Sequence, residues 1–206
     1  MPWGRARGPN RSSRAMQEYD EIADSYIATR RPQVGVSEIA EFAASLAAGS
    51  RVLDLGCGDG IPVSQMLVRR GFAICGIDSS ANMIEKFRSH FPGAPAQCAR
   101  IQDSDFFQTS FHAVIAWGVL FHLTPADQEA VIAKVAKSLE AGGRFLFTSG
   151  AEEGVVESAM HGVTFRYISL GSSNYTRLLH TNGMRLVSEH FDEWDNYSYI
   201  AEKMTL

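Results

Sequence analysis

The stretch of sequence that decides the fold is Val52-Leu53-Asp54-Leu55-Gly56-Cys57-Gly58-Asp59-Gly60, an apolar run that leads into three alternate glycines. The run from Arg51 to Leu55 is apolar apart from Arg51 and Asp54, which is typical of a central parallel strand. Glycines carry no side chain, so they let the backbone approach a ligand closely. The stretch therefore predicts a buried strand followed by a ligand-binding turn.

The spacing of these glycines excludes two other nucleotide-binding loops. The dinucleotide fingerprint G-x-G-x-x-G would need a third glycine where this chain has Ile61, and no G-x-x-x-x-G-K-[ST] phosphate loop occurs. A second apolar strand ends in Asp78, whose carboxylate is suited to accept hydrogen bonds from both hydroxyls of a ribose. Asp78 could instead cap the following helix, as Ser79 or Ser80 could equally do.

With Asp54 ahead of it, the glycine loop resembles motif I of the class I S-adenosylmethionine (SAM) dependent methyltransferases. The resemblance implies SAM as the cofactor, S-adenosylhomocysteine (SAH) as the product, and Asp54 as the residue that orients the loop and the SAM amino group. It also implies that Asp78, with Ser79 beside it, binds the ribose. Met83 fits the place of the residue that packs on the adenine, although a core methionine would occupy the same place. The expected backbone contacts to the methionine part of SAM come from Gly56, Gly58 and Gly60.

The third motif of this family is altered. Many relatives have an acid after strand three that meets the adenine amino group, but this chain has Arg100 at that place. Either Asp103 supplies the acid, or the backbone at Ile101 and Gln102 holds the adenine alone. The family's Phe-Asp dipeptide before strand four is altered too, because His112 replaces the acid; we expect this change to affect only a surface hydrogen bond.

Strand four ends in a segment that resembles the family's junction between SAM and the methyl acceptor. The backbone at Ala116 and Trp117 would face the sulfonium, and the Trp117 side chain would face either the substrate or the core. His122 is the candidate catalytic base, since a neutral imidazole accepts a proton near pH 7; a hydrogen-bonded histidine at a helix start is the alternative. Methyl transfer depends mainly on in-line positioning and exclusion of water, so a base is needed only when the attacking atom carries a proton.

Two segments are expected to form the acceptor pocket. The first is a helix over 16–29 with the residues after it, in which Tyr26 and Arg30 are candidate cofactor contacts. Arg30 would pair with the SAM carboxylate or stay solvated. The second is the region 150–170, with one helix from Glu152 to His161 and irregular structure after it. Its aromatic residues would shape a pocket for a small, partly apolar acceptor.

Alternating strand and helix patterns predict a doubly wound α/β fold with a mostly parallel, seven-stranded sheet and an antiparallel hairpin at the carboxyl terminus. Strands are expected at 51–55, 73–77, 113–117, 144–148, 184–191 and 197–202. Helices are expected at 16–29, 36–47, 62–70, 80–90 and 172–182, with another that begins near Thr124 and ends at Gly142-Gly143.

Composition agrees with one globular domain, since 45% of the 206 residues are hydrophobic and 20% are charged. Residues 1–15 are expected to be a flexible basic arm, or a stretch ahead of the natural start, and 16–206 a single methyltransferase domain. No apolar run reaches transmembrane length, and the histidines and cysteines show no metal-ligand spacing. Cys57, Cys75 and Cys98 are expected to be buried, reduced thiols of a cytoplasmic protein.

The residues together predict an enzyme that transfers a methyl group from SAM to a small-molecule acceptor. A protein that binds SAM or SAH without catalysis is the alternative. Methylation of RNA is a weaker alternative, because the net charge is −4 and the arginines concentrate only near the amino terminus.

Overall fold

The computed structural model describes residues 27–31, 33–160 and 162–205. Its main sheet consists of β1 (Arg51–Leu55), β2 (Ala73–Asp78), β3 (Ala96–Cys98), β4 (Phe111–Ala116), β5 (Leu139–Ser149), β8 (Met184–Phe191) and β9 (Tyr197–Lys203). The strand order is β3-β2-β1-β4-β5-β9-β8. Only β9 runs against its neighbours, pairing antiparallel with both β5 and β8. The predicted doubly wound sheet with its antiparallel hairpin is therefore confirmed.

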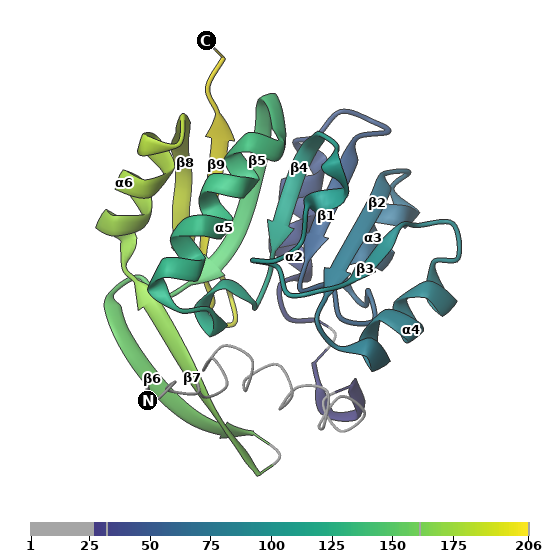
Figure 1. The fold of residues 1–206 in the computed structure, drawn as a ribbon, viewed down its shortest axis with the longest axis horizontal. Coiled ribbons are helices and arrows are strands. Elements are labelled where there is room, and N and C mark those ends of the chain that lie inside the picture. Colours follow the sequence, from purple (N-terminus) through teal and green to yellow (C-terminus); the bar gives the residue numbers. More distant parts are fainter. Residues whose placement is uncertain (1–26, 32, 161, 206) are drawn as a thin grey trace, which may run out of the picture.

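Helices cover both faces of this sheet (Figure 1). They are α2 (Val36–Ala44), α3 (Val63–Arg69), α4 (Ala81–His90), α5 (Pro125–Ser138), α6 (Ser172–Thr181) and the short 3₁₀ turns η1 (Phe106–Gln108) and η2 (Leu120–His122). Successive side chains of a strand point to opposite faces, so Val52 packs with α2, α3 and α4, while Leu53 packs with α5 and α6. The two cores hold the carboxyl ends of the parallel strands at one edge, where ligands bind in open α/β sheets.

A separate two-stranded sheet, the arm, consists of β6 (Glu153–Met160) and β7 (Val163–Leu170). It projects beyond the carboxyl edge of the main sheet (Figure 1). The predicted helix from Glu152 to His161 is therefore wrong. The β-branched pair Val155-Val156 favours a strand over a helix, and Gly162 turns the chain with a φ of 81°.

The boundary between α5 and β5 also differs from the prediction. The helix ends at Ser138 rather than at Gly142-Gly143, and Leu139 already pairs with Phe111 of β4. Leu139 is 2% exposed, and burying it in the core favours extended backbone there. Of the predicted helix over 16–29, only 27–29 are described, and these are helical; Tyr26 and residues 1–15 lie outside the described residues.

The cysteines do not all behave as expected. Cys57 and Cys75 are buried, but Cys98, at the end of β3, is exposed. The expectation that all three are buried is therefore wrong, because β3 is the edge strand of the sheet and pairs only with β2.

Candidate functional site

The glycine loop leaves β1 at the carboxyl edge of the sheet and is fixed by backbone hydrogen bonds. The N–H groups of Gly56 and Cys57 both donate to the carbonyl of Ile77 on β2, at 2.8 and 3.1 Å. Gly56, Gly58 and Gly60 all have positive φ, a conformation that other residues rarely adopt. A Cβ built at Gly60 would lie 2.3 Å from the Phe91 ring. At Gly58 the nearest such contact is Met83 Sδ at 3.9 Å, so this glycine leaves a cradle beside Met83.

Asp78 joins this loop to the start of α4. Its Oδ2 accepts from the Gly58 N–H and its Oδ1 from the Ser80 N–H, both at 2.9 Å. Ser80 is the cap of α4, since its hydroxyl accepts from the Met83 N–H at 3.2 Å. A carboxylate has about four acceptor positions, so these two bonds are compatible with the ribose role predicted for Asp78. Ser79 lies in the same turn, and its carbonyl accepts from Cys98 Sγ.

Asp54 lies beneath the loop and is 2% exposed. Its Oδ2 accepts a 2.7 Å hydrogen bond from the Ser64 hydroxyl on α3. Burial, and to a smaller extent the nearby Asp78 carboxylate, raise the pKa of Asp54 to about 7, although the Ser64 hydrogen bond acts in the opposite direction. The hydrogen bond between Asp54 and Ser64 thus links β1 to α3. The sequence did not predict this role of Ser64.

Arg30 reaches the loop from the amino-terminal side. Its guanidinium makes two bonds to the carboxylate of Asp59, at 2.5 and 2.8 Å, and Asp59 is 2% exposed. The Asp59 carboxylate also accepts from the Ile61 N–H at 3.1 Å. The structure therefore places Arg30 at the cofactor loop, paired with a protein carboxylate. The sequence did not identify Asp59 as the partner of Arg30, because Asp59 was interpreted only as part of the glycine loop.

β4 ends at Ala116, and Trp117 follows it directly, next to the loop. Ala116 is fully buried, and Trp117 packs against the core beneath α2. A Cβ built at Gly35 would lie 2.3 Å from the Trp117 ring, so the indole fills the space that this glycine leaves. The backbone beyond it is fixed by a 2.8 Å bond from the Gly118 N–H to the Thr148 hydroxyl. The Trp117 side chain thus packs against the core and stays partly exposed, while its predicted role toward the substrate remains a prediction.

His122 lies in an aromatic cluster under the arm. Its ring centroid is 4.8 Å from that of Phe121, 5.1 Å from that of Tyr167 and 5.9 Å from that of Phe165. Burial lowers the pKa of His122 to about 4. The imidazole is therefore neutral at pH 7, but its low pKa makes it a weaker base than an ordinary histidine.

The altered third motif forms a compact turn after β3. Arg100 forms an ion pair with Asp103, whose side chain is 54% exposed. Lys134 on α5 donates from Nζ to the carbonyls of Ile101 and Gln102, at 3.3 and 2.8 Å, and to a third at Ser104. Asp103 is thus engaged by the arginine that replaces the family's acid. No local pattern pointed to Lys134, which lies far away along the chain.

The second altered position, His112, lies near the start of β4, beside β1. Its Nδ1 accepts a 3.0 Å bond from the Arg51 backbone N–H, and its Nε2 lies 3.6 Å from Glu140. The His112 side chain is 44% exposed, so the substitution affects a hydrogen bond near the surface, as predicted.

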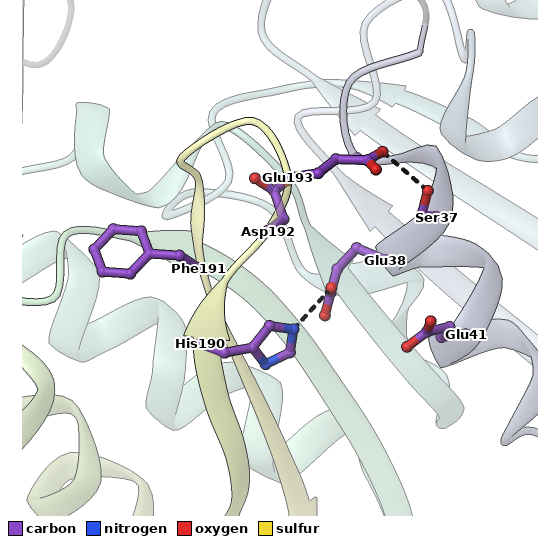
Figure 2. A pocket seen from close by; sticks show the side chains of 8 residues that line it. Ser37, Glu38, Glu41, His190, Phe191, Asp192 and Glu193 are labelled. Atoms are coloured by element: carbon purple, nitrogen blue, oxygen red, sulfur yellow. Dashed lines mark hydrogen bonds and ion pairs between the residues drawn. The ribbon is translucent and has the colours of Figure 1, made fainter.

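A pocket of about 210 Å³ opens between α2 and the β8–β9 turn (Figure 2). Glu38 accepts from His190 at 2.9 Å and from the Ser198 hydroxyl at 3.1 Å, while Ser37 donates to Glu193 at 3.1 Å. These bonds fasten the start of α2, next to the Trp117 contact, to the carboxyl-terminal hairpin. The pocket was not foreseen, because its lining residues are far apart in the sequence.

The described part of the chain contains neither a cluster of metal ligands nor a membrane-spanning helix. No group of three or more His, Cys, Asp or Glu side chains there is placed to hold a metal ion. Within the same ranges, no helix combines the length and apolar character that crossing a membrane requires.

The strand order and the helices on both faces are those of the class I methyltransferase fold. Residues 52–143 match a family model described as a methyltransferase domain. A ubiquinone biosynthesis O-methyltransferase of Idiomarina loihiensis is 30% identical over 106 residues, which cover 49% of this chain and 42% of that protein. Part of the chain is thus similar to methyltransferase domains whose relatives transfer methyl groups.

Solved structures share the fold over nearly the whole chain. A 1,6-didemethyltoxoflavin-N1-methyltransferase of Burkholderia thailandensis with bound SAH matches with a TM-score of 0.74 and 17% identity, covering 98% of this chain and 94% of that one. A magnesium protoporphyrin IX methyltransferase of Synechocystis PCC 6803 with bound SAM matches with a TM-score of 0.72 and 14% identity, covering 97% and 100%. The chain spans about half the length of the first curated relatives that it matches, at 42% and 47%.

Proposed function

We propose that this protein binds SAM along the glycine loop and transfers its methyl group to a small-molecule acceptor. The observation that carries the proposal is the bond from the Gly58 N–H to Asp78, because it joins the loop and the predicted ribose carboxylate into one preformed site. The cradle at Gly58 fits a ligand that approaches the backbone closely. SAM would supply an electrophilic methyl group on a sulfonium.

The chain's own contribution is to position the two reactants and exclude water. Gly56, Gly58 and Gly60 would hold the methionine part, and Asp78 the ribose. Arg30, kept in place by Asp59, would present its guanidinium to the methionine carboxylate.

The arm supplies one wall for the acceptor. In the β6–β7 register Val156 lies opposite Tyr167, so both side chains are on one face, and Phe165 is on that face too. Tyr167 and Phe165 contact His122 at the end of η2, close after β4. Apart from Ser158, these side chains are apolar or aromatic, which supports a small, partly apolar acceptor. His122, neutral at pH 7, would accept a proton only from an acidic acceptor group.

Titration calorimetry with SAH, with NAD in parallel, tests the cofactor assignment. We expect micromolar binding of SAH and no response to NAD. An acceptor screen that detects SAH release from SAM then tests catalysis. SAH binding without turnover on any acceptor would favour the non-catalytic alternative, and a folded protein that does not bind SAH would contradict the proposal.

A further inference from the structure

The side chain of Gln102 is the strongest unexplained feature near the site. Both amide atoms, Oε1 and Nε2, are buried, and neither has a hydrogen-bond partner among the described residues. Buried polar groups are normally paired, so an unpaired amide in a native structure calls for a partner outside the protein. Gln102 belongs to the turn after β3, the place where the family's adenine contact is altered.

The position of this turn favours the base of a nucleoside as that partner. Cys98, the last residue of β3, pairs in register with Asp78, and the Ala99 N–H donates to the Asp78 carbonyl at 2.9 Å. The turn thus begins beside the carboxylate assigned to the ribose. A nucleoside held there would carry its base next to the turn, with Met83 on the neighbouring helix.

The other candidates for the adenine amino group are engaged elsewhere. Asp103 is paired with Arg100 and is largely exposed. The family's acid is absent, because Arg100 occupies its place. A side-chain amide offers both an acceptor and donors, and it matches adenine, which presents an amino donor next to a ring acceptor.

Lys134 fixes the backbone on which Gln102 is mounted. Its ammonium donates to the carbonyls of Ile101 and Gln102 and, at 2.6 Å, of Ser104. It also lies 4.9 Å over the Phe106 ring. The peptide groups on both sides of the Gln102 side chain are therefore held from α5, which restricts where its amide can lie.

We propose that the Gln102 amide reads the adenine of SAM in place of the missing acid, with Oε1 accepting from the 6-amino group, and that Lys134 is its positioning residue. The proposal rests on the function proposed above. It makes Gln102 a specificity-determining residue that the family motif does not contain.

The test compares the binding of SAH with that of its 6-deamino analogue, in which hydrogen replaces the adenine amino group. We expect the wild type to bind SAH about tenfold more tightly, because the analogue leaves Oε1 unpaired. Gln102→Met, which keeps the length of the side chain and removes the amide, should bind both ligands equally. Gln108→Met, an exposed glutamine in the same segment, is the matched control and should keep the wild-type ratio.

The outcomes separate this proposal from the proposed function. SAH binding with the same preference in Gln102→Met, or with no preference in the wild type, would overturn the role of Gln102. Failure of the wild type to bind SAH would overturn the proposed function as well. Because Gln102→Met removes an unpaired buried amide, it should melt at or above the wild-type temperature, which separates a binding effect from unfolding.

A second pair of variants tests Lys134. Lys134→Met should lower the ratio of the two affinities below the wild-type value, and Lys134→Arg should restore most of it, because the guanidinium can still donate to the turn carbonyls. An unchanged ratio in Lys134→Met would show that Lys134 only stabilises the fold.

Discussion

The glycine loop and the arm lie at the same edge of the sheet, but they are built in opposite ways. The loop is held by bonds to Ile77 and Asp78 and by close packing at Gly60. The arm leaves every side chain from Glu153 to Ala159 exposed, and it contacts the body through β7 and the aromatic cluster at His122. The loop therefore has one permitted geometry, while the arm tolerates change.

The largest expected effect is at the loop. Gly60→Ala would place a methyl group against Phe91 at a φ of 83°, adding about 1–3 kcal/mol of overpacking to about 1–2 kcal/mol of backbone strain. The control is Gly71→Ala, which has the same φ of 83° but open space around it, and should lose only the strain. Urea unfolding measures both. If Gly60→Ala and Gly71→Ala lose the same free energy of unfolding, Phe91 moves aside and the loop is no more rigid than the arm.

Asp78→Ala should weaken SAH binding by about 100-fold, since it removes charge-assisted bonds to the ribose and the acceptor of the Gly58 N–H. Calorimetry with SAH measures the effect. Glu129→Ala, at an exposed position of α5, should bind as the wild type does. If Asp78→Ala binds SAH as tightly as the wild type, Asp78 does not hold the ribose.

The arm side should respond to pH through His122. Its pKa is about 4 in the folded protein and near 6.5 when unfolded, so between these values the unfolded chain binds more protons. Stability from His122 is thus lost as the pH falls, by at most about 2 kcal/mol from pH 6.5 to 5. His122→Phe should remove this contribution, so between pH 6.5 and 5 the wild type should lose up to that much unfolding free energy relative to the variant, as urea unfolding at each pH would measure.

The same pH series contains its own controls. Asp54, with a folded pKa of about 7, acts in the opposite direction, but it does so equally in wild type and variant. The exposed His180 provides a control, and His180→Gln should keep the wild-type slope of unfolding free energy against pH. A wild-type slope in His122→Phe would mean that the cluster under the arm is open to water.

The smallest effect is expected on the arm itself. Val156 is 65% exposed, so Val156→Asn should change the free energy of unfolding by less than about 0.5 kcal/mol. Urea unfolding provides the measurement. A loss well above that value would show that Val156 is covered in solution, and it would remove the contrast between the loop and the arm.

Sequence reasoning succeeded where one residue type admits one backbone geometry. The alternate glycines predicted the turn, and the apolar runs predicted β1, β2 and β4 to within a few residues. It failed for β6 because Glu152 to His161 combines charged residues compatible with a helix with the β-branched pair Val155-Val156, and pairing with β7 decides in favour of a strand. It also missed the start of β5, since the Phe111–Leu139 pairing comes from tertiary contact.

The sequence by itself determined the fold class, the glycine loop and the resemblance to methyltransferases, because each depends on local patterns of glycine, acid and apolar residues. Tertiary structure alone decided that Arg30 meets Asp59, that Lys134 holds the turn around Gln102, and that His122 is buried beneath the arm. These contacts join residues far apart along the chain. Their distances and burial set the charges and pKa values of the site, and no local pattern encodes them.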